Sequence, residues 1–476
     1  MSPYAPSTVR QASSFDLVVL GASTAGLASA WYASRRGLSV AVVDRDEVVG
    51  GIASSKVVDG QRVDLGSHGL HPSIRPDLLA DLRGLLGDEL QWRQPGGRIR
   101  LEGRWLDFPI RSTDLMRHAP ARLALRAAGD VALQPWRTHR SRRTSTPPAS
   151  FGAKVRHDLG PTVAAAIYEP YALKLWGVDA QRLSPELFGR RTRARGWAHV
   201  RQLIRRTPTS GFWYPAGGFG RIPEVLAADV DARGGSVLLS TEAQRAEASY
   251  HGVTVHVAGG SSLRARTLVS TLSPAALLRM FDDAPVIVHE AVQQIRHRAA
   301  VFVYLSVPAH RYTDFEAHYF PEPGVSVTRL SEPKGYRSSS ADPVGRTVLC
   351  AELPVTVGDA LWNLSDDELG ARVRAELIST GLPDPAPRAV HVERRDDLYP
   401  VHEIGFERRQ RVVDAWVNGL PNVLALSRQT LFAQDNTHHA LAMGEGLAAC
   451  LRHDGSVDVA RWRDAQASVR AHLVEG

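Results

Sequence analysis

Residues 16–51 of this 476-residue chain decide the fold: DLVVLGASTAGLASAWYASRRGLSVAVVDRDEVVGG. Asp16–Gly21 is an apolar run that predicts a strand, the small residues after it predict a helix, and Leu38–Asp44 predicts a second strand. This order of strand, glycine turn, helix, strand and acid is typical of the βαβ unit that binds a dinucleotide. The sequence therefore predicts an α/β fold that begins with such a unit.

Each position of the turn has a physical task. Gly21 permits a sharp turn, the residue at position 23 must let backbone N–H groups approach a pyrophosphate, and Gly26 lets helix and strand pack closely. The helix N-terminus then stabilises the diphosphate. Asp44, which lies 23 positions after Gly21, stands where a carboxylate accepts hydrogen bonds from an adenosine ribose. Ser23 occupies the usual place of the middle glycine, so a simple strand-to-helix turn is the alternative interpretation.

A second glycine pair separates these interpretations. Gly50 and Gly51, followed by Ile52, come just after Asp44 and let the backbone approach a ligand a second time. Here the sequence resembles the flavin-binding superfamily of amine oxidases, protoporphyrinogen oxidases, phytoene desaturases and UDP-galactopyranose mutases. The resemblance implies FAD, bound in an extended conformation along the N-terminal domain.

The resemblance covers most of the chain and implies how it is divided. It implies a Rossmann-like FAD-binding domain of the glutathione-reductase type, interrupted by an inserted α+β substrate domain. We expect the FAD-binding domain to comprise residues 1–75, 207–284 and 399–476. We expect residues 76–206 to form a mostly helical part of the substrate domain and residues 285–398 to form a β-rich part. Within the first part, Gly96–Ile110 reads as a hairpin that turns at Glu102 and Gly103.

Two further motifs carry the resemblance toward the flavin ring. Residues 63–68, VDLGSH, resemble the DxGGH loop that lies against the ring. Gly66 matches the first glycine of that motif, and Ser67 replaces the second. The resemblance implies that His68 lies nearest the ring. The closing motif resembles a strand and helix whose N-terminus points at the N1–O2 edge of the flavin, where reduction places negative charge. The residues that we assign to the cofactor from this motif and from the adenine-side strand are Ala243, Ser427, Arg428, Asn436 and Thr437.

The middle of the chain resembles the galactopyranose mutases. Arg329, Glu332, Lys334 and Glu352 are similar to their RxxExK…E arrangement, although alternating charges on strands are more often solvated salt bridges. The loop Ser270–Ala275 lacks the acidic residue that the mutases carry there. The resemblance therefore leaves both oxidoreductase and isomerase chemistry open.

Composition excludes several classes of function. The net charge is +7, but arginines are spread along the chain and only four lysines occur, which does not indicate a nucleic-acid partner. An arginine-rich segment at 190–206 is either a solvated helix face or a wall that binds an anionic substrate. The sequence contains no apolar run long enough to span a membrane and no export signal at its start. Cys350 and Cys450 suit the reducing cytoplasm and cannot form a metal site alone.

Together these features favour an FAD-dependent oxidoreductase that takes a hydride and a proton from a small molecule and is reoxidised by oxygen or another electron acceptor. His68, Arg329 and His438 are the candidate catalytic residues. The arginine-rich composition resembles that of bacterial flavoenzymes of specialised metabolism. One alternative is a nucleotide-sugar mutase in which the reduced flavin is the nucleophile. Another is a flavin-free binding protein, because Ser23, Ser67 and Ser427 each replace a glycine.

Overall fold

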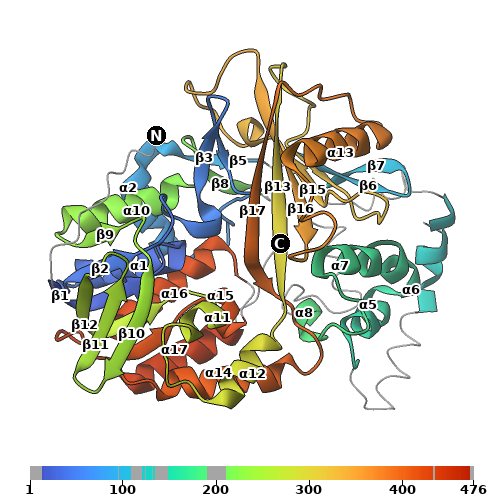
Figure 1. The fold of residues 1–476 in the computed structure, drawn as a ribbon. Coiled ribbons are helices and arrows are strands. Elements are labelled where there is room, and N and C mark those ends of the chain that lie inside the picture. The colour runs from blue at the N-terminus through green and yellow to red at the C-terminus, as the bar shows by residue number, and fades with distance from the viewer. Residues whose placement is uncertain are drawn as a thin grey trace.

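The computed structural model describes most of the chain, namely residues 13–94, 96–108, 121–123, 125–130, 132–133, 148–189, 211–432 and 435–471. The arginine-rich segment 190–206 lies outside the described residues. Figure 1 shows two β-sheets side by side, with the long strands β13 and β17 near the centre of the molecule. The fold is a mixed α/β fold with parallel and antiparallel pairing.

The predicted N-terminal βαβ unit is confirmed. Strand β1 (Ser13–Leu20) pairs in parallel with β2 (Val40–Val43), and α1 (Thr24–Arg35) connects them. The first sheet has the strand order β10-β11-β12-β1-β2-β9, with β18 beside β12. The bounds of its other strands are β9 Ser236–Leu238, β10 Ala243–Ser249, β11 Gly252–Val257, β12 Ser262–Ser270 and β18 Val423–Ala425.

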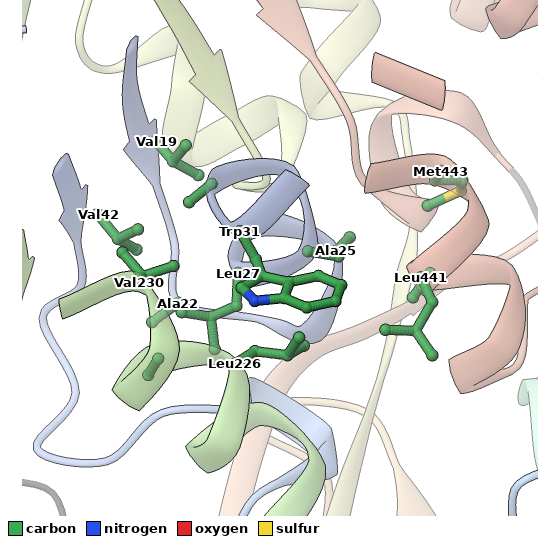
Figure 2. Packing of buried hydrophobic residues seen from close by; sticks show 14 of the residues in the cluster. Val19, Ala22, Ala25, Leu27, Trp31, Val42, Leu226, Val230, Leu441 and Met443 are labelled. Atoms are coloured by element: carbon green, nitrogen blue, oxygen red, sulfur yellow. The ribbon is translucent and has the colours of Figure 1, made fainter. Parts of the chain in front are cut away.

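Alternation along β1 places apolar side chains on both faces of this sheet. Leu17 and Val19 enter one core cluster, whereas Val18 and Leu20 enter another. The first cluster lies under α1, α10 (Arg221–Ala232) and α16 (Thr437–Ala449). Figure 2 shows Trp31 of α1 near Leu226 of α10, with Leu441 of α16 on the other side. Helices cover both faces, as expected for parallel strands buried on both sides.

The second sheet has the order β17-β13-β16-β15-β14-β6-β7. The predicted hairpin is confirmed: β6 and β7 pair around Glu102 and Gly103, which both have positive φ. Neighbouring strands are antiparallel except β14 and β6. The bounds are β6 Gly97–Leu101, β7 Arg104–Phe108, β13 His297–Val307, β14 Ala317–Tyr319, β15 Arg329–Ser331, β16 Thr347–Val355 and β17 Ala389–Pro400.

The remaining elements cover the sheets and join them. Two small ladders pair β3 (Ser55–Val58) with β4 (Gln61–Asp64) and β5 (Leu90–Arg93) with β8 (Phe212–Pro215). The other helices are α2 Pro76–Leu86, α5 Phe151–Leu159, α6 Pro161–Val163, α7 Glu169–Trp176, α8 Glu186–Gly189, α11 Pro274–Leu278, α12 Val286–Gln293, α13 Asp366–Ser379, α14 Phe406–Gly419, α15 Arg428–Leu431 and α17 Val459–Ala471. Short turns of other helix types are η1 Gly51–Ala53, η2 Gly87–Glu89, η3 Ala164–Tyr168 and η4 Pro333–Tyr336.

Asp64, at the end of β4, joins the two halves of the molecule. Its carboxylate, 1% exposed, accepts hydrogen bonds from Ser55 Oγ (2.6 Å), the Phe219 N–H (2.9 Å) and the Tyr214 hydroxyl. Its carbonyl oxygen accepts a hydrogen bond from Tyr304 Oη of β13 (2.9 Å). A buried carboxylate is tolerated when donors surround it in this way.

We expect Asp64→Asn to lower the free energy of unfolding by about 3 kcal/mol, because an amide nitrogen would face the Ser55 or Tyr214 donor and leave it unsatisfied. Urea denaturation followed by tryptophan fluorescence measures this change. Asp88→Asn is the matched control, since Asp88 is exposed, and it should change the value by less than about 0.5 kcal/mol. Equal effects of the two substitutions would contradict the joining role of Asp64.

Candidate functional site

A cavity of about 1270 Å³ lies where the first sheet meets the second. Most residues that the sequence marks as site residues line it. The cavity wall formed by the described residues includes Gly21, Ser23, Asp44, Gly50, Gly51, Ile52, Gly66, Ser67, His68, Ala243, Arg329, Ser427, Arg428, Asn436 and Thr437, but neither Gly26 nor His438. The structure thus brings together positions that are up to about 400 residues apart in the sequence.

The first glycine turn has no room for side chains. Gly21 has φ +99°, and a Cβ atom there would lie 2.2 Å from Thr271 Oγ1. A Cβ atom on Gly26 would lie 2.1 Å from the carbonyl oxygen of Gly21, so the first turn of α1 touches the preceding turn directly. Gly26 therefore acts behind the cavity wall, through packing.

Ser23 closes this turn through its hydroxyl group. The Ser23 side chain is the N-cap of α1, where Oγ accepts the Gly26 N–H (3.3 Å) and donates to Thr271 Oγ1 (3.1 Å). Its backbone is in the extended region, with φ −66° and ψ 165°. The serine therefore fits the turn without strain, and its hydroxyl is used within the protein.

The second glycine pair, Gly50 and Gly51, is hydrogen-bonded to the first glycine turn. Gly50 has φ +111°, and its N–H donates to the carbonyl oxygen of Ala22 (2.7 Å). A Cβ atom on Gly50 would lie 2.8 Å from Pro223 Cγ. Gly51 also has positive φ (+56°), and Ile52 follows on the cavity wall. Both glycines adopt the left-handed region, which other residues rarely adopt.

Asp44 lies at the end of β2 with its carboxylate beside the glycine turn. Oδ2 accepts the Ala22 N–H (2.6 Å), and Oδ1 accepts the Asp46 N–H (2.9 Å). Burial raises the pKa of Asp44, and these two backbone hydrogen bonds oppose the rise. Each carboxylate oxygen keeps a lone pair for a further donor.

The loop after Asp64 contacts the second sheet. Gly66 has φ +87°, and a Cβ atom there would lie 3.0 Å from the Phe302 ring. The Ser67 N–H donates to Glu352 Oε1 (2.8 Å), and Ser67 Oγ lies 2.8 Å from Tyr336 Oη. Strand β16 therefore fixes the backbone of this loop.

Arg329 and Glu352 form a two-point ion pair on the cavity wall. Arg329 Nε lies 2.7 Å from Glu352 Oε1, and Nη2 lies 2.8 Å from Oε2. Burial, the largest single effect, disfavours the guanidinium charge, but the attraction and hydrogen bonding of Glu352, with the field of nearby tyrosines, together raise the pKa of Arg329. The other two residues of the motif have partners elsewhere. Glu332 accepts a hydrogen bond from the Thr347 hydroxyl, and Lys334 donates to two backbone carbonyl oxygens. Only part of the motif therefore faces the cavity.

His68 is a buried imidazole at the cavity. Its ring stacks on Phe219 with centroids 5.1 Å apart, and Nδ1 is buried without a hydrogen-bond partner among the described residues. Burial lowers the pKa of His68, although the nearby Asp64 carboxylate opposes this effect. The ring is therefore neutral near pH 7.

His438 lies beside the site and not on its wall. Its ring is 5.7 Å from that of His71 and 3.9 Å from that of His439, and Nε2 lies 3.4 Å from Ser73 Oγ. The His438 ring contacts these neighbours, whereas Asn436 and Thr437 line the cavity, and the catalytic role of His438 stays a prediction. A helix turns about 100° per residue, so adjacent side chains face different surroundings.

The closing motif places a serine and an arginine on the wall. Ser427 is the N-cap of α15, where Oγ accepts the Thr430 N–H (2.9 Å) and donates to the Leu272 carbonyl oxygen (3.1 Å). Arg428 Nε lies 2.9 Å from Asp435 Oδ1, and its guanidinium group lies over the Tyr399 ring. Next to it, α16 begins at Thr437.

Sequence reasoning missed a large part of the cavity wall. Aromatic side chains that the sequence analysis did not assign to the site also line the cavity, and they include Phe108, Tyr171, Trp176, Phe212, Tyr319, Tyr336 and Tyr399. Tyr336 and Tyr319 come from segments that show only ordinary strand and turn patterns. Within the described residues, no group of His, Cys, Asp and Glu side chains is arranged to hold a metal ion. No helix in the same part of the chain is long and apolar enough to cross a membrane.

The family model for flavin-containing amine oxidoreductases matches residues 24–403. No curated protein sequence matches the chain. Several solved structures share the fold over nearly their whole length. Reduced UDP-galactopyranose mutase has a TM-score of 0.79 at 18% identity, covering 96% of this chain and 99% of the mutase. Putrescine oxidase bound to putrescine has a TM-score of 0.64 at 17% identity (92% and 98% covered). Cyclohexylamine oxidase from Brevibacterium oxydans has a TM-score of 0.63 at 17% identity (97% and 99% covered).

We expect Gly26→Ala to lower the free energy of unfolding by about 2–4 kcal/mol, because the new methyl group would overlap the Gly21 carbonyl oxygen. Gly84→Ala in α2 is the control, since among the described residues no atom beyond the neighbouring backbone of the helix lies within 4 Å of a Cβ atom at that position. It should raise the same quantity by about 0.5–1 kcal/mol. Urea denaturation of both variants checks the opposite signs, and a loss of stability in both would contradict the packing role of Gly26.

Proposed function

This chain belongs to the family of flavin-containing amine oxidoreductases, and from that premise we propose that it oxidises a small molecule by removing a hydride and a proton from it. The observation that carries the proposal is a cavity whose described wall includes the glycine turn at Gly21, the loop at His68 and several aromatic side chains. It offers room for an extended dinucleotide and for a substrate beside the ring. FAD, when bound, supplies the hydride acceptor.

The residues of the cavity fit FAD. The turn at Gly21 and Gly26 has no space for a Cβ atom, and α1 begins directly after Ser23, so the N–H groups of its first turn other than that of Gly26 would face a diphosphate. We propose that Asp44 accepts the ribose hydroxyl groups through its remaining lone pairs. The other proposed cofactor contacts are Gly50, Gly51, Ile52, Gly66, Ser67, Ala243, Ser427, Arg428, Asn436 and Thr437.

We propose the domain division that the sequence predicts. The strands of the first sheet come from residues 13–43, 236–270 and 423–425, which fall within the proposed FAD-binding segments 1–75, 207–284 and 399–476. This pattern supports a glutathione-reductase-type FAD domain. The strands of the second sheet support an inserted substrate domain.

In the proposed reaction the protein orients the substrate and stabilises charge. The aromatic side chains of the cavity wall would exclude water and hold an apolar part of the substrate. The N-terminus of α16 at Thr437 would stabilise negative charge on the ring. His68, neutral because burial lowers its pKa, would position the substrate by hydrogen bonding. The Arg329–Glu352 ion pair would hold the loop beside the ring. Oxygen or another acceptor would reoxidise the enzyme.

The mutase reaction is not favoured as the function. Similarity to the mutase at 18% identity shows a shared fold alone. Glu332 and Lys334, half of the mutase-like motif, bind other parts of the protein and do not line the cavity wall formed by the described residues. We therefore expect no reaction with a nucleotide sugar, which serves as the control compound in the substrate experiment below.

We expect Asp44→Ala to weaken FAD binding about 10- to 100-fold, because it removes the ribose acceptor and leaves the Ala22 N–H without its partner. Fluorescence titration of apoprotein with FAD measures the dissociation constant. Asp88→Ala, an exposed carboxylate away from the cavity, should leave it within twofold. Unchanged FAD affinity in Asp44→Ala would remove Asp44 from the cofactor site.

We expect the purified protein to carry oxidised flavin whose visible absorption bleaches anaerobically with at least one member of a series of amines, alcohols and tetrapyrroles. The wall of aromatic side chains favours compounds with an apolar body. UDP-galactopyranose added to dithionite-reduced protein is the control, and the ring-contracted sugar should not form. Sugar isomerisation without any bleaching by the series would overturn the oxidoreductase proposal.

A further inference from the structure

Two hydroxyl groups meet at the cavity wall. Ser67 Oγ and Tyr336 Oη lie 2.8 Å apart, and both residues line the cavity. They come from different halves of the molecule, since Ser67 follows β4 and Tyr336 ends the short η4 turn after β15. Ser67 is also one of the three positions where this chain has a serine in place of an expected glycine.

The pair has one hydrogen more than its own contact uses. Two hydroxyl groups carry two hydrogens, and the bond between Oγ and Oη uses only one of them, whichever group donates. Among the described residues, neither hydroxyl has a second hydrogen-bond partner. The second hydrogen therefore needs an acceptor that the cavity must supply, and a ligand atom in the cavity is suitably placed to be that acceptor.

Both members of the pair are held in place. The Ser67 N–H is bound by Glu352, which is itself fixed by the two contacts of Arg329. The Tyr336 ring is 6% exposed and packs against Phe212 and Tyr214, at centroid distances of 5.8 Å and 5.6 Å. Burial raises the pKa of Tyr336, so this hydroxyl keeps its hydrogen. A donor fixed in this way loses little entropy when it binds an acceptor.

The geometry points to a ligand-binding role: we propose that the Ser67–Tyr336 hydroxyl pair donates a hydrogen bond to an acceptor oxygen or nitrogen of the bound flavin or of the substrate beside it. The inference rests on the proposed function, because it takes the cavity to hold FAD and a substrate. The pair is a positioning element, in which one hydroxyl touches the ligand and the other orients it. A glycine at position 67 would lack this donor.

The test compares Ser67→Ala and Tyr336→Phe with the parent protein, each loaded with FAD. Ser331→Ala is the matched control, since its hydroxyl is 1% exposed in the same sheet, lies 3.4 Å from the Cys350 carbonyl oxygen, and does not belong to the described cavity wall. Thermal melting selects the variants that fold. Ser67→Gly, which adds no atoms, replaces Ser67→Ala if that variant does not fold.

Three quantities are measured: the flavin absorption spectrum, the flavin midpoint potential, and the KM for the compound that bleaches the flavin fastest. If the flavin is the acceptor, the spectrum shifts and the potential becomes more negative in Ser67→Ala or Tyr336→Phe, because reduction adds charge that the donor stabilises. If the substrate is the acceptor, KM rises about tenfold, the effect of losing about 1.4 kcal/mol, and the potential stays unchanged.

The inference is overturned if both variants match Ser331→Ala in spectrum, potential and KM. That result leaves the proposed function intact, since the protein still binds FAD and is still reduced by its substrate. A parent protein that binds no FAD would instead remove the proposed function, and the outcome would be visible before any variant is compared. The two failures are therefore distinguishable.

Discussion

The buried carboxylate of Asp64 is the constraint on which the site depends. The carboxylate accepts hydrogen bonds from β3, β8 and the segment before α10. The backbone carbonyl oxygen of Asp64 accepts a further hydrogen bond from the Tyr304 hydroxyl of β13. These donors are neutral groups, so the hydrogen bonds that they donate offset the cost of burying the charge. Because Asp64 is separated from Gly66 and Ser67 only by Leu65, the donors that satisfy its carboxylate also fix where that loop lies between the two sheets.

The cavity wall is consequently shared by two sheets whose alignment is set by a few polar contacts. The loop after Asp64 is held on one side by the hydrogen bonds to the Asp64 carboxylate and on the other by Glu352, which accepts a hydrogen bond from the Ser67 N–H. Strand β17 crosses from Asp46, which binds Arg395, toward Arg428, which lies over Tyr399. Polar groups left unpaired at such a junction are costly, so small shifts between the sheets are resisted.

The sequence predicted what local geometry determines. The βαβ unit and the hairpin at Gly103 follow from turn residues and apolar periodicity, whereas the start of α16 is implied by the family resemblance. It did not predict Tyr336 as a site residue or the packing of the His438 ring against His71. Tyr336 is 269 residues from Ser67, and its position depends on strand pairing across the second sheet, which no local pattern specifies. The direction in which the His438 side chain points depends on how α16 packs against its neighbours.

The three serines illustrate why a substitution in a motif has no fixed meaning. At Ser23 and Ser427 the hydroxyl caps a helix and donates a hydrogen bond to another protein group, so its hydrogen is used within the fold. Because serine is a preferred N-cap residue, the capping role at both positions could be predicted from the sequence. At Ser67 the hydroxyl meets only another hydroxyl, and the chain that the structure describes offers no acceptor for the second hydrogen. The same replacement of glycine by serine is therefore structural at two positions and leaves a donor for a ligand at the third.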